Sequence, residues 1–199
     1  MTKETDQQYE QRMKKTKAAV DERVARAQQE RGTLIVLTGN GKGKSTSGFG
    51  TIFRAAGYGI KAAVVQYIKG TWPCGERDLA LTLGIPVEIM GTGFTWETQN
   101  RDKDIAAAEK AWAASKAFLE DDSIEVLLLD EITYMLTYEY LDVKEVVAAL
   151  AARPHNQTVI ITGRNCHPDV IALADTVSEI NPVKHAFEEG IKARKGVDW

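Results

Sequence analysis

The chain has 199 residues, of which 44% are hydrophobic and 27% are charged, and its formal net charge is −3. This composition is typical of one globular α/β domain, and the net charge argues against a protein that binds nucleic acid by broad phosphate neutralisation. No apolar run approaches the length of a membrane span, and residues 1–6 lack the apolar core of a signal peptide, so we expect a cytoplasmic protein. Cys74 and Cys166 show no CxxC spacing, and we expect two reduced thiols.

Residues 3–31 contain no glycine or proline and are rich in helix-favouring residues. The larger apolar side chains form a thin stripe at helical spacing: Tyr9, Met13, Val20 and Val24. A helix with so little apolar surface is marginal in isolation, so either a solvated tail or an arm ordered by another surface fits the pattern. The regular stripe favours the arm. We therefore divide the chain into an N-terminal helical arm, residues 1–31, and an α/β domain, residues 32–199.

After Gly32, apolar segments alternate with helix-like segments. The segments predicted to be strands are residues 33–38, 62–68, 87–90, 124–129, 158–162 and 176–180. Helices are predicted at residues 44–58, 100–120, 143–152 and 168–174. This alternation indicates a mostly parallel sheet with helices on both faces, and ligands of such sheets bind beyond the carboxyl ends of the strands.

The first of these strands runs into a glycine-rich loop, Thr-Gly-Asn-Gly-Lys-Gly-Lys-Ser-Thr at residues 38–46, and then into a helix. Such a loop turns successive backbone N–H groups toward an anion, and the helix adds the positive end of its dipole. Thr38 stands where the usual P-loop pattern has its first glycine, so the loop is expected to be specialised. The residues predicted to bind phosphate are Gly39, Asn40, Gly41, Lys42, Gly43, Lys44, Ser45 and Thr46.

The strand predicted at residues 124–129 is followed by two carboxylates, Asp130 and Glu131. An acidic residue at this place in P-loop proteins holds the metal, and with the Ser45 hydroxyl the three residues are predicted metal ligands. Glu131 has two alternative roles, as the base of a hydrolase or as a metal or solvent ligand of a transferase. A merely structural acidic pair at a helix start is the weaker interpretation.

Arg164 follows the strand predicted at residues 158–162, where it could reach a triphosphate; a surface salt bridge is the alternative. The three histidines show no metal-ligand spacing. Phe94 and Trp96 lie on a glycine-containing connector, residues 91–100. Large aromatics on such a loop either cover a flat apolar ligand or pack against the core.

Six segments together resemble the P-loop class of ATP:corrinoid adenosyltransferases, also described as cob(I)yrinic acid a,c-diamide adenosyltransferases. They are residues 38–46, 66–72 (Gln-Tyr-Ile-Lys-Gly-Thr-Trp), 75–77 (Gly-Glu-Arg), 92–100 (Thr-Gly-Phe-Thr-Trp-Glu-Thr-Gln-Asn), 129–134 (Leu-Asp-Glu-Ile-Thr-Tyr) and 160–164 (Ile-Ile-Thr-Gly-Arg). The likeness covers nearly the whole chain, and the Gly-Phe-Thr-Trp-Glu-Thr segment is the most specific. Thr38 is no departure from this family, whose loop also begins Thr-Gly-Asn-Gly.

The resemblance implies a RecA-like P-loop homodimer that binds ATP, Mg²⁺ (or Mn²⁺) and a corrinoid, either cobalamin or a cobyrinic or cobinamide precursor. The reduced Co(I) centre would attack the ribose C5′ of ATP and expel triphosphate, in adenosylcobalamin biosynthesis or salvage. Lys44, Glu131 and Arg164 would be catalytic. Phe94 and Trp96 would close the lower face of the corrin, so that a flavin-type donor can reduce the cobalt. The arm would cap a nucleotide site, its own or the partner's, with Arg31 near its end.

Two other functions compete with this one. A P-loop ATPase or small-molecule kinase would act at the γ-phosphate with Glu131 as base, but the loop start and the aromatic connector weigh against it. A non-catalytic corrinoid carrier with a nucleotide switch would need a cobalt-binding histidine in an Asp-x-His context, which the sequence lacks. Neither a membrane nor a nucleic-acid partner is expected.

Overall fold

The structure is a computed structural model that describes residues 4–68, 70, 72–91 and 100–198. The chain divides into two compact units, residues 1–30 and residues 31–199. None of the helices among the described residues is long and apolar enough to cross a membrane.

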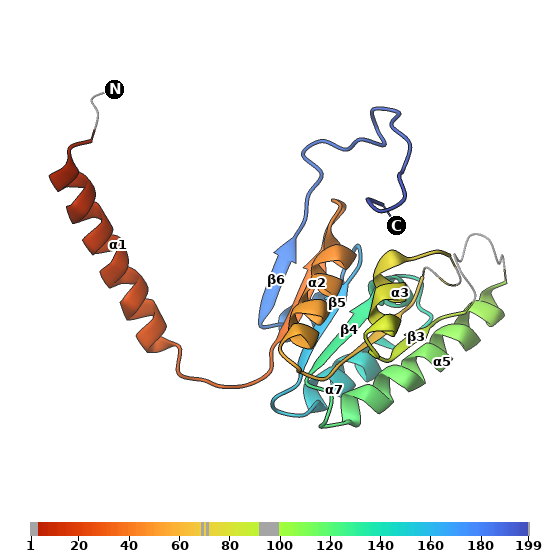
Figure 1. Ribbon diagram of the computed structural model, residues 1–199. Helices are drawn as coiled ribbons and strands as arrows, with labels where there is room; N and C mark the ends of the chain where they lie inside the picture. Colours follow the sequence, from red (N-terminus) through yellow and green to blue (C-terminus); the bar gives the residue numbers. More distant parts are fainter. Residues whose placement is uncertain (1–3, 69, 71, 92–99, 199) are drawn as a thin grey trace. The chain divides into compact units, whose positions relative to one another are not determined.

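The first unit is the helix α1, Asp6–Arg26 (Figure 1). It begins with a capping box, in which the Thr5 hydroxyl accepts the Gln8 N–H and the Gln8 side chain accepts the Thr5 N–H. Exposed ion pairs four residues apart follow, such as Lys14 with Glu10. The four side chains of the predicted apolar stripe are between 41% and 67% exposed. The predicted helix is thus confirmed, although it ends five residues before Arg31; that it caps a nucleotide site stays a prediction.

The second unit contains one sheet of six described strands, in the order β3-β2-β4-β5-β1-β6, and every pairing is parallel (Figure 1). The strands are β1 Leu34–Thr38, β2 Ala62–Gln66, β3 Val87–Ile89, β4 Val126–Asp130, β5 Thr158–Thr162 and β6 Thr176–Glu179. Each lies within two residues of its predicted bounds. The predicted α/β class with the P-loop, RecA-like fold is confirmed, and the sheet is entirely parallel among these strands.

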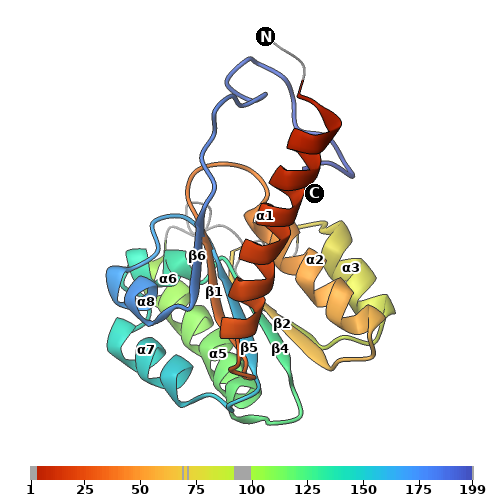
Figure 2. The ribbon, with the colours of Figure 1, turned by 90° about the vertical axis from the view of Figure 1, so that its left-hand side faces the viewer.

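Helices cover both faces of the sheet, as the alternating pattern predicted (Figure 2). On one face lie α2, Lys44–Gly57, and α3, Gly75–Thr82; on the other lie α5, Arg101–Glu120, α6, Thr133–Thr137, α7, Val143–Ala152, and α8, Pro168–Leu173. Neighbouring side chains of a strand point to opposite faces. In β4, accordingly, Leu128 packs with α2 and α3, while Leu127 and Leu129 pack with α5, α6 and α7. The central strands β2, β4, β5 and β1 are therefore packed between two apolar layers, whereas the edge strands β3 and β6 are largely exposed.

A carboxylate on the turn before β6 ties together the amino ends of the strands. The Asp175 carboxylate pairs with the two terminal guanidinium nitrogens of Arg31, one at 2.8 Å, and accepts the Leu34 N–H at 2.8 Å. Arg153 lies 3.6 Å from the same carboxylate. These partners, Arg31 first, hold the pKa of Asp175 well below its usual range. Arg31 thus belongs to the amino edge of the sheet.

Asp175→Asn should lower the free energy of unfolding at pH 7 by about 1 kcal/mol, because the pair with Arg31 is partly exposed to solvent. The lowered pKa means that the carboxylate stabilises the fold fully above its unfolded pKa of about 4, and progressively less as the pH falls toward the folded value. Urea unfolding of both proteins between pH 2 and pH 7 checks this. Asp122→Asn, at an exposed residue, is the control. A difference in unfolding free energy between wild type and Asp175→Asn that stayed the same at pH 2 would contradict the prediction.

Candidate functional site

The glycine-rich loop contains backbone conformations that glycine adopts readily and other residues rarely adopt. Gly39 has φ +95° and Gly43, the N-cap of α2, has φ +113°, both in the left-handed region. A Cβ at Gly39 would lie 2.5 Å from the Ile180 carbonyl oxygen. The Gly41 N–H donates to that same oxygen at 2.6 Å. The loop is therefore tightly curved, and it ends at the amino end of α2.

Lys44 is the first residue of α2 and is only 8% exposed. Its ammonium group donates to the Gly41 carbonyl oxygen at 2.8 Å. Burial, and then the positive charge of Arg164, lower the pKa of Lys44, while the carboxylates of Glu131 and Asp130 oppose this shift. Two cations that line one cavity favour an anionic ligand there.

A cavity of about 220 Å³ lies beside this loop, at the carboxyl ends of the strands. Nine of the residues predicted from the sequence line it: Asn40, Gly41, Lys42, Gly43, Lys44, Ser45, Thr46, Glu131 and Arg164. The remaining lining residues are Glu76, Tyr134, His185, Val197 and Asp198. Most of the predicted phosphate site is therefore brought together by the fold.

Other predicted site residues lie elsewhere. Asp130 is fully buried behind the cavity, and Gly39 packs against the Ile180 backbone. Arg31 precedes β1, whereas the loop follows it, so the length of a five-residue strand, roughly 17 Å, separates them. Arg31 thus does not join the loop of its own subunit; a role at a second subunit's nucleotide stays a prediction. Phe94 and Trp96 lie outside the described residues.

The buried carboxylate of Asp130 is held by two side chains from the neighbouring strands. The Thr162 hydroxyl donates to Asp130 Oδ1 at 2.7 Å, and Gln66 Nε2 donates to Oδ2 at 3.0 Å. The strand order places β4, which carries Asp130, between β2 and β5, and this makes both contacts possible. Both carboxylate oxygens of Asp130 are therefore bound within the protein, and that Asp130 holds a metal stays a prediction.

Glu131 faces the cavity because the backbone turns sharply after β4. Its φ is +65°, an unusual value for a residue with a side chain. The Glu131 N–H donates to the Thr162 hydroxyl at 2.9 Å, the same hydroxyl that donates to Asp130. One buried hydroxyl thus links both acidic residues.

Among the described residues there is no cluster of three or more His, Cys, Asp or Glu side chains that could hold a metal. Ser45 and Glu131 nevertheless both line the cavity, and hydroxyl and carboxylate oxygens are the donors that Mg²⁺ prefers. Mg²⁺ commonly takes one or two protein ligands and completes its shell with water and phosphate oxygens. The residues present fit a magnesium ion that binds together with a nucleotide.

Two of the elements that shape the cavity, the helices α3 and α6, were not predicted from the sequence. Glu76 lies on the short helix α3, which begins with glycine, and Tyr134 lies on α6, which has only five residues. The residues that follow β6 show no helical or strand periodicity, so nothing in the sequence indicated that His185, Val197 and Asp198 return to the loop.

Burial raises the pKa of Tyr134, with the Glu131 carboxylate adding to the effect.

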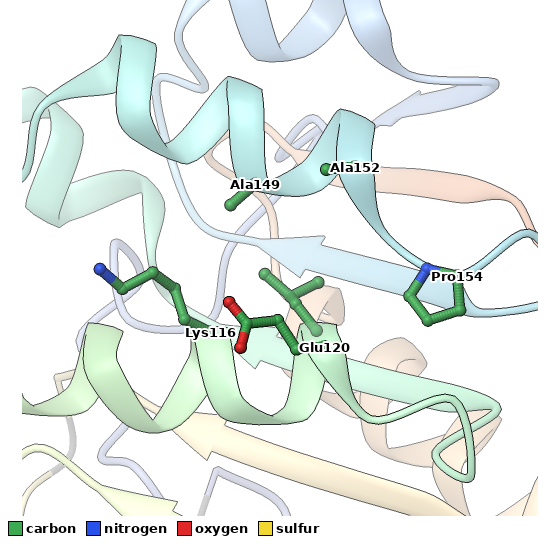
Figure 3. A pocket seen from close by; sticks show the side chains of 6 residues that line it. Lys116, Glu120, Ala149, Ala152 and Pro154 are labelled. Carbon is green, nitrogen blue, oxygen red and sulfur yellow. The ribbon is translucent and has the colours of Figure 1, made fainter.

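A second hollow, of about 310 Å³, lies between α5 and α7 (Figure 3). Lys116 and Glu120 of α5 and Ala149 and Ala152 of α7 line it together with Leu119 and Pro154. It lies near the ends of α5 and α7 that lead into β4 and β5, toward the amino ends of those strands. Ligands of parallel sheets bind at the opposite edge, where the glycine-rich loop lies.

Comparison with known proteins identifies the family of the chain. Residues 30–199 match the family described as ATP:corrinoid adenosyltransferase BtuR/CobO/CobP. The chain is 57% identical over 195 residues to the corrinoid adenosyltransferase of Escherichia coli (strain K12), covering 98% of this chain and 100% of that protein. It is 56% identical to the corrinoid adenosyltransferase CobA of Salmonella typhimurium, with the same coverage, and 48% identical to that of Pseudomonas aeruginosa, covering 98% of each chain. The chain therefore belongs to the ATP:corrinoid adenosyltransferase family.

Proposed function

We propose that this protein transfers the 5′-deoxyadenosyl group of ATP to the Co(I) centre of a corrinoid and releases inorganic triphosphate. The observation that carries the proposal is the convergence of the loop, Lys44 and Arg164 on one cavity at the carboxyl edge of the sheet. The cobalt centre supplies the electron pair of the new Co–C bond, and the C5′–O bond breaks with its electron pair going to the triphosphate. The protein's main electrostatic task is to stabilise that leaving group.

The lining residues fit this task. The contact of Lys44 with the Gly41 carbonyl oxygen holds its ammonium group at the loop, where the phosphates would bind. Arg164 presents a planar group with several donors to phosphate oxygens. Ser45 and Glu131 would hold Mg²⁺, whose charge adds to theirs, while Asp130 orients this edge of the site from behind. Lys42 and the loop amides would bind the remaining phosphate oxygens.

The corrinoid side of the site is proposed from the family. Phe94 and Trp96 would cover the lower face of the corrin and displace its axial ligand. This would lower the energy of adding an electron to Co(II) and allow reduction by a flavin-type donor. A homodimer, with each N-terminal arm over a nucleotide site, and a cytoplasmic location complete the proposal.

The test is to incubate the protein with Mg·ATP and chemically reduced cobalamin, and to follow the corrinoid absorbance and the phosphate product. A light-sensitive adenosylated corrinoid with equimolar triphosphate is expected. Accumulation of ADP and phosphate without alkylation would instead favour a P-loop ATPase or kinase that acts at the γ-phosphate. ATP consumption that does not depend on corrinoid would count against the proposal in the same way.

Trp96→Ala should slow adenosylation that starts from Co(II) cobalamin by about tenfold or more, and adenosylation from pre-reduced Co(I) by less than about threefold. The reason is that removal of the axial ligand matters for reduction and not for the attack on ATP. Rates from both starting states, measured with one reductant, check this. Tyr58→Ala, at an aromatic residue that is 80% exposed near the end of α2, is the control. Equal losses in both assays would mean that the aromatic loop serves only the fold.

A further inference from the structure

The chain beyond β6 returns to the phosphate loop. We refer to residues 180–198 as the C-terminal segment. At its start, the Ile180 carbonyl oxygen accepts the Gly41 N–H at 2.6 Å, and at its end the Asp198 carboxylate pairs with the ammonium group of Lys42. The segment is thus tied to the loop at two places 18 residues apart.

The end of the segment is a defined turn. The Arg194 N–H donates to Asp198 Oδ2 at 2.7 Å, and the Val197 N–H donates to the Arg194 carbonyl oxygen at 3.1 Å. Val197 and Gly196 also line a cavity of about 320 Å³ with Phe53 and Leu79, next to the phosphate site. Hydrogen bonds within the turn therefore orient the Asp198 carboxylate, and its pair with Lys42 connects the turn to the loop.

The charge of Asp198 stands where an anionic ligand is expected. Lys42 first, and then the Arg194 N–H, lower the pKa of Asp198, so this side chain is a carboxylate at neutral pH. Asp198 lines the same cavity as Lys44 and Arg164. A carboxylate oxygen on a phosphate-loop lysine occupies one of the places that a phosphate oxygen would take.

We propose that Asp198 is an internal competitor of the triphosphate: its pair with Lys42 and a bound triphosphate exclude each other, so that nucleotide binding releases Asp198 together with the turn at residues 194–198. The proposal rests on the proposed function only in that the loop binds a triphosphate. A carboxylate kept beside the bound triphosphate would repel it, so the lysine changes partner and the turn loses its anchor. The Lys42 side chain is half exposed, so breaking its pair with Asp198 costs little free energy.

The first test compares the binding of Mg·ATP and of inorganic tripolyphosphate by calorimetry in the full-length wild type, Asp198→Asn and Glu188→Gln. Asparagine keeps the acceptor for the Arg194 N–H but removes the charge. Asp198→Asn should bind both ligands about fivefold more tightly. Glu188→Gln removes the same charge from an exposed residue of the same segment, and its affinities should stay within about twofold of the wild type. Unchanged or weaker binding by Asp198→Asn would overturn the proposal.

The second test is hydrogen exchange of the C-terminal segment with and without tripolyphosphate. Faster exchange of the Arg194 and Val197 amides in the presence of the ligand is expected, because the turn is released. Slower exchange would mean that the segment closes over the ligand, which would overturn the proposal. Neither test uses corrinoid: a wild-type protein that bound neither ligand would contradict the proposed function itself, whereas equal binding by wild type and Asp198→Asn would contradict only the role of Asp198.

Discussion

Lys44→Ala is expected to weaken the binding of Mg·ATP by about 30-fold to 100-fold, and to lower the adenosylation rate at subsaturating ATP at least as much. The lysine is 8% exposed and its pKa is lowered by burial and by Arg164, so the groups around it compensate its charge poorly. A triphosphate supplies that compensation. Charge-assisted hydrogen bonds of this kind contribute about 1.5–3 kcal/mol each.

Calorimetry with Mg·ATP and tripolyphosphate checks this prediction, with Lys61→Ala as the control because Lys61 is exposed and lies before β2, at the opposite edge of the sheet. The thermal stability of Lys44→Ala should not fall by more than that of the control, because a buried charge with a lowered pKa opposes folding. An unchanged affinity for ATP would show that the glycine-rich loop is not the phosphate site.

The sheet was predictable because its strands are continuous apolar runs bounded by polar residues. Residues 158–162 form a strand with the predicted bounds, buried on both faces as a parallel strand must be. The loop at residues 38–46 was predictable for a similar reason, since its glycines and lysines follow such a strand directly. By contrast, α3 and α6 are short helices whose residues carry no clear periodicity.

What the sequence could not indicate is which strands lie side by side. Thr162 is the last residue of an apolar strand, and only the strand order places it between the loop after β1 and the two acidic residues at the carboxyl end of β4. The pair between Asp198 and Lys42 likewise joins residues 156 positions apart in the sequence, through a segment without regular structure. Tertiary contacts of this kind leave no local signal, because neither residue type nor spacing near Thr162 or Asp198 depends on the partner.

Thr162→Val should lower the turnover number of adenosylation by about tenfold or more and raise the Mg²⁺ concentration needed for half-maximal rate. Valine has nearly the same shape but lacks the hydroxyl, so Asp130 loses a donor at 2.7 Å and the Glu131 N–H loses its acceptor at 2.9 Å. With that acceptor gone, the left-handed backbone of Glu131 loses the contact that holds its carboxylate toward the cavity. The residue is a positioning residue, since it acts through Asp130 and Glu131.

Thr162→Ser keeps the hydroxyl and should retain most of the activity and the wild-type Mg²⁺ dependence. Thr158→Val serves as the stability control: that hydroxyl, on the same strand at the far edge, also accepts a backbone N–H, from Thr33 at 3.2 Å. Loss of either hydroxyl should cost about 1–3 kcal/mol of unfolding free energy. Only the loss at position 162 should change the Mg²⁺ dependence, because only that hydroxyl touches the acidic pair. Thr162→Val could instead lose stability but keep the wild-type turnover number and Mg²⁺ dependence. The Thr162 hydroxyl would then serve only the fold, and metal binding would not depend on how Glu131 is held.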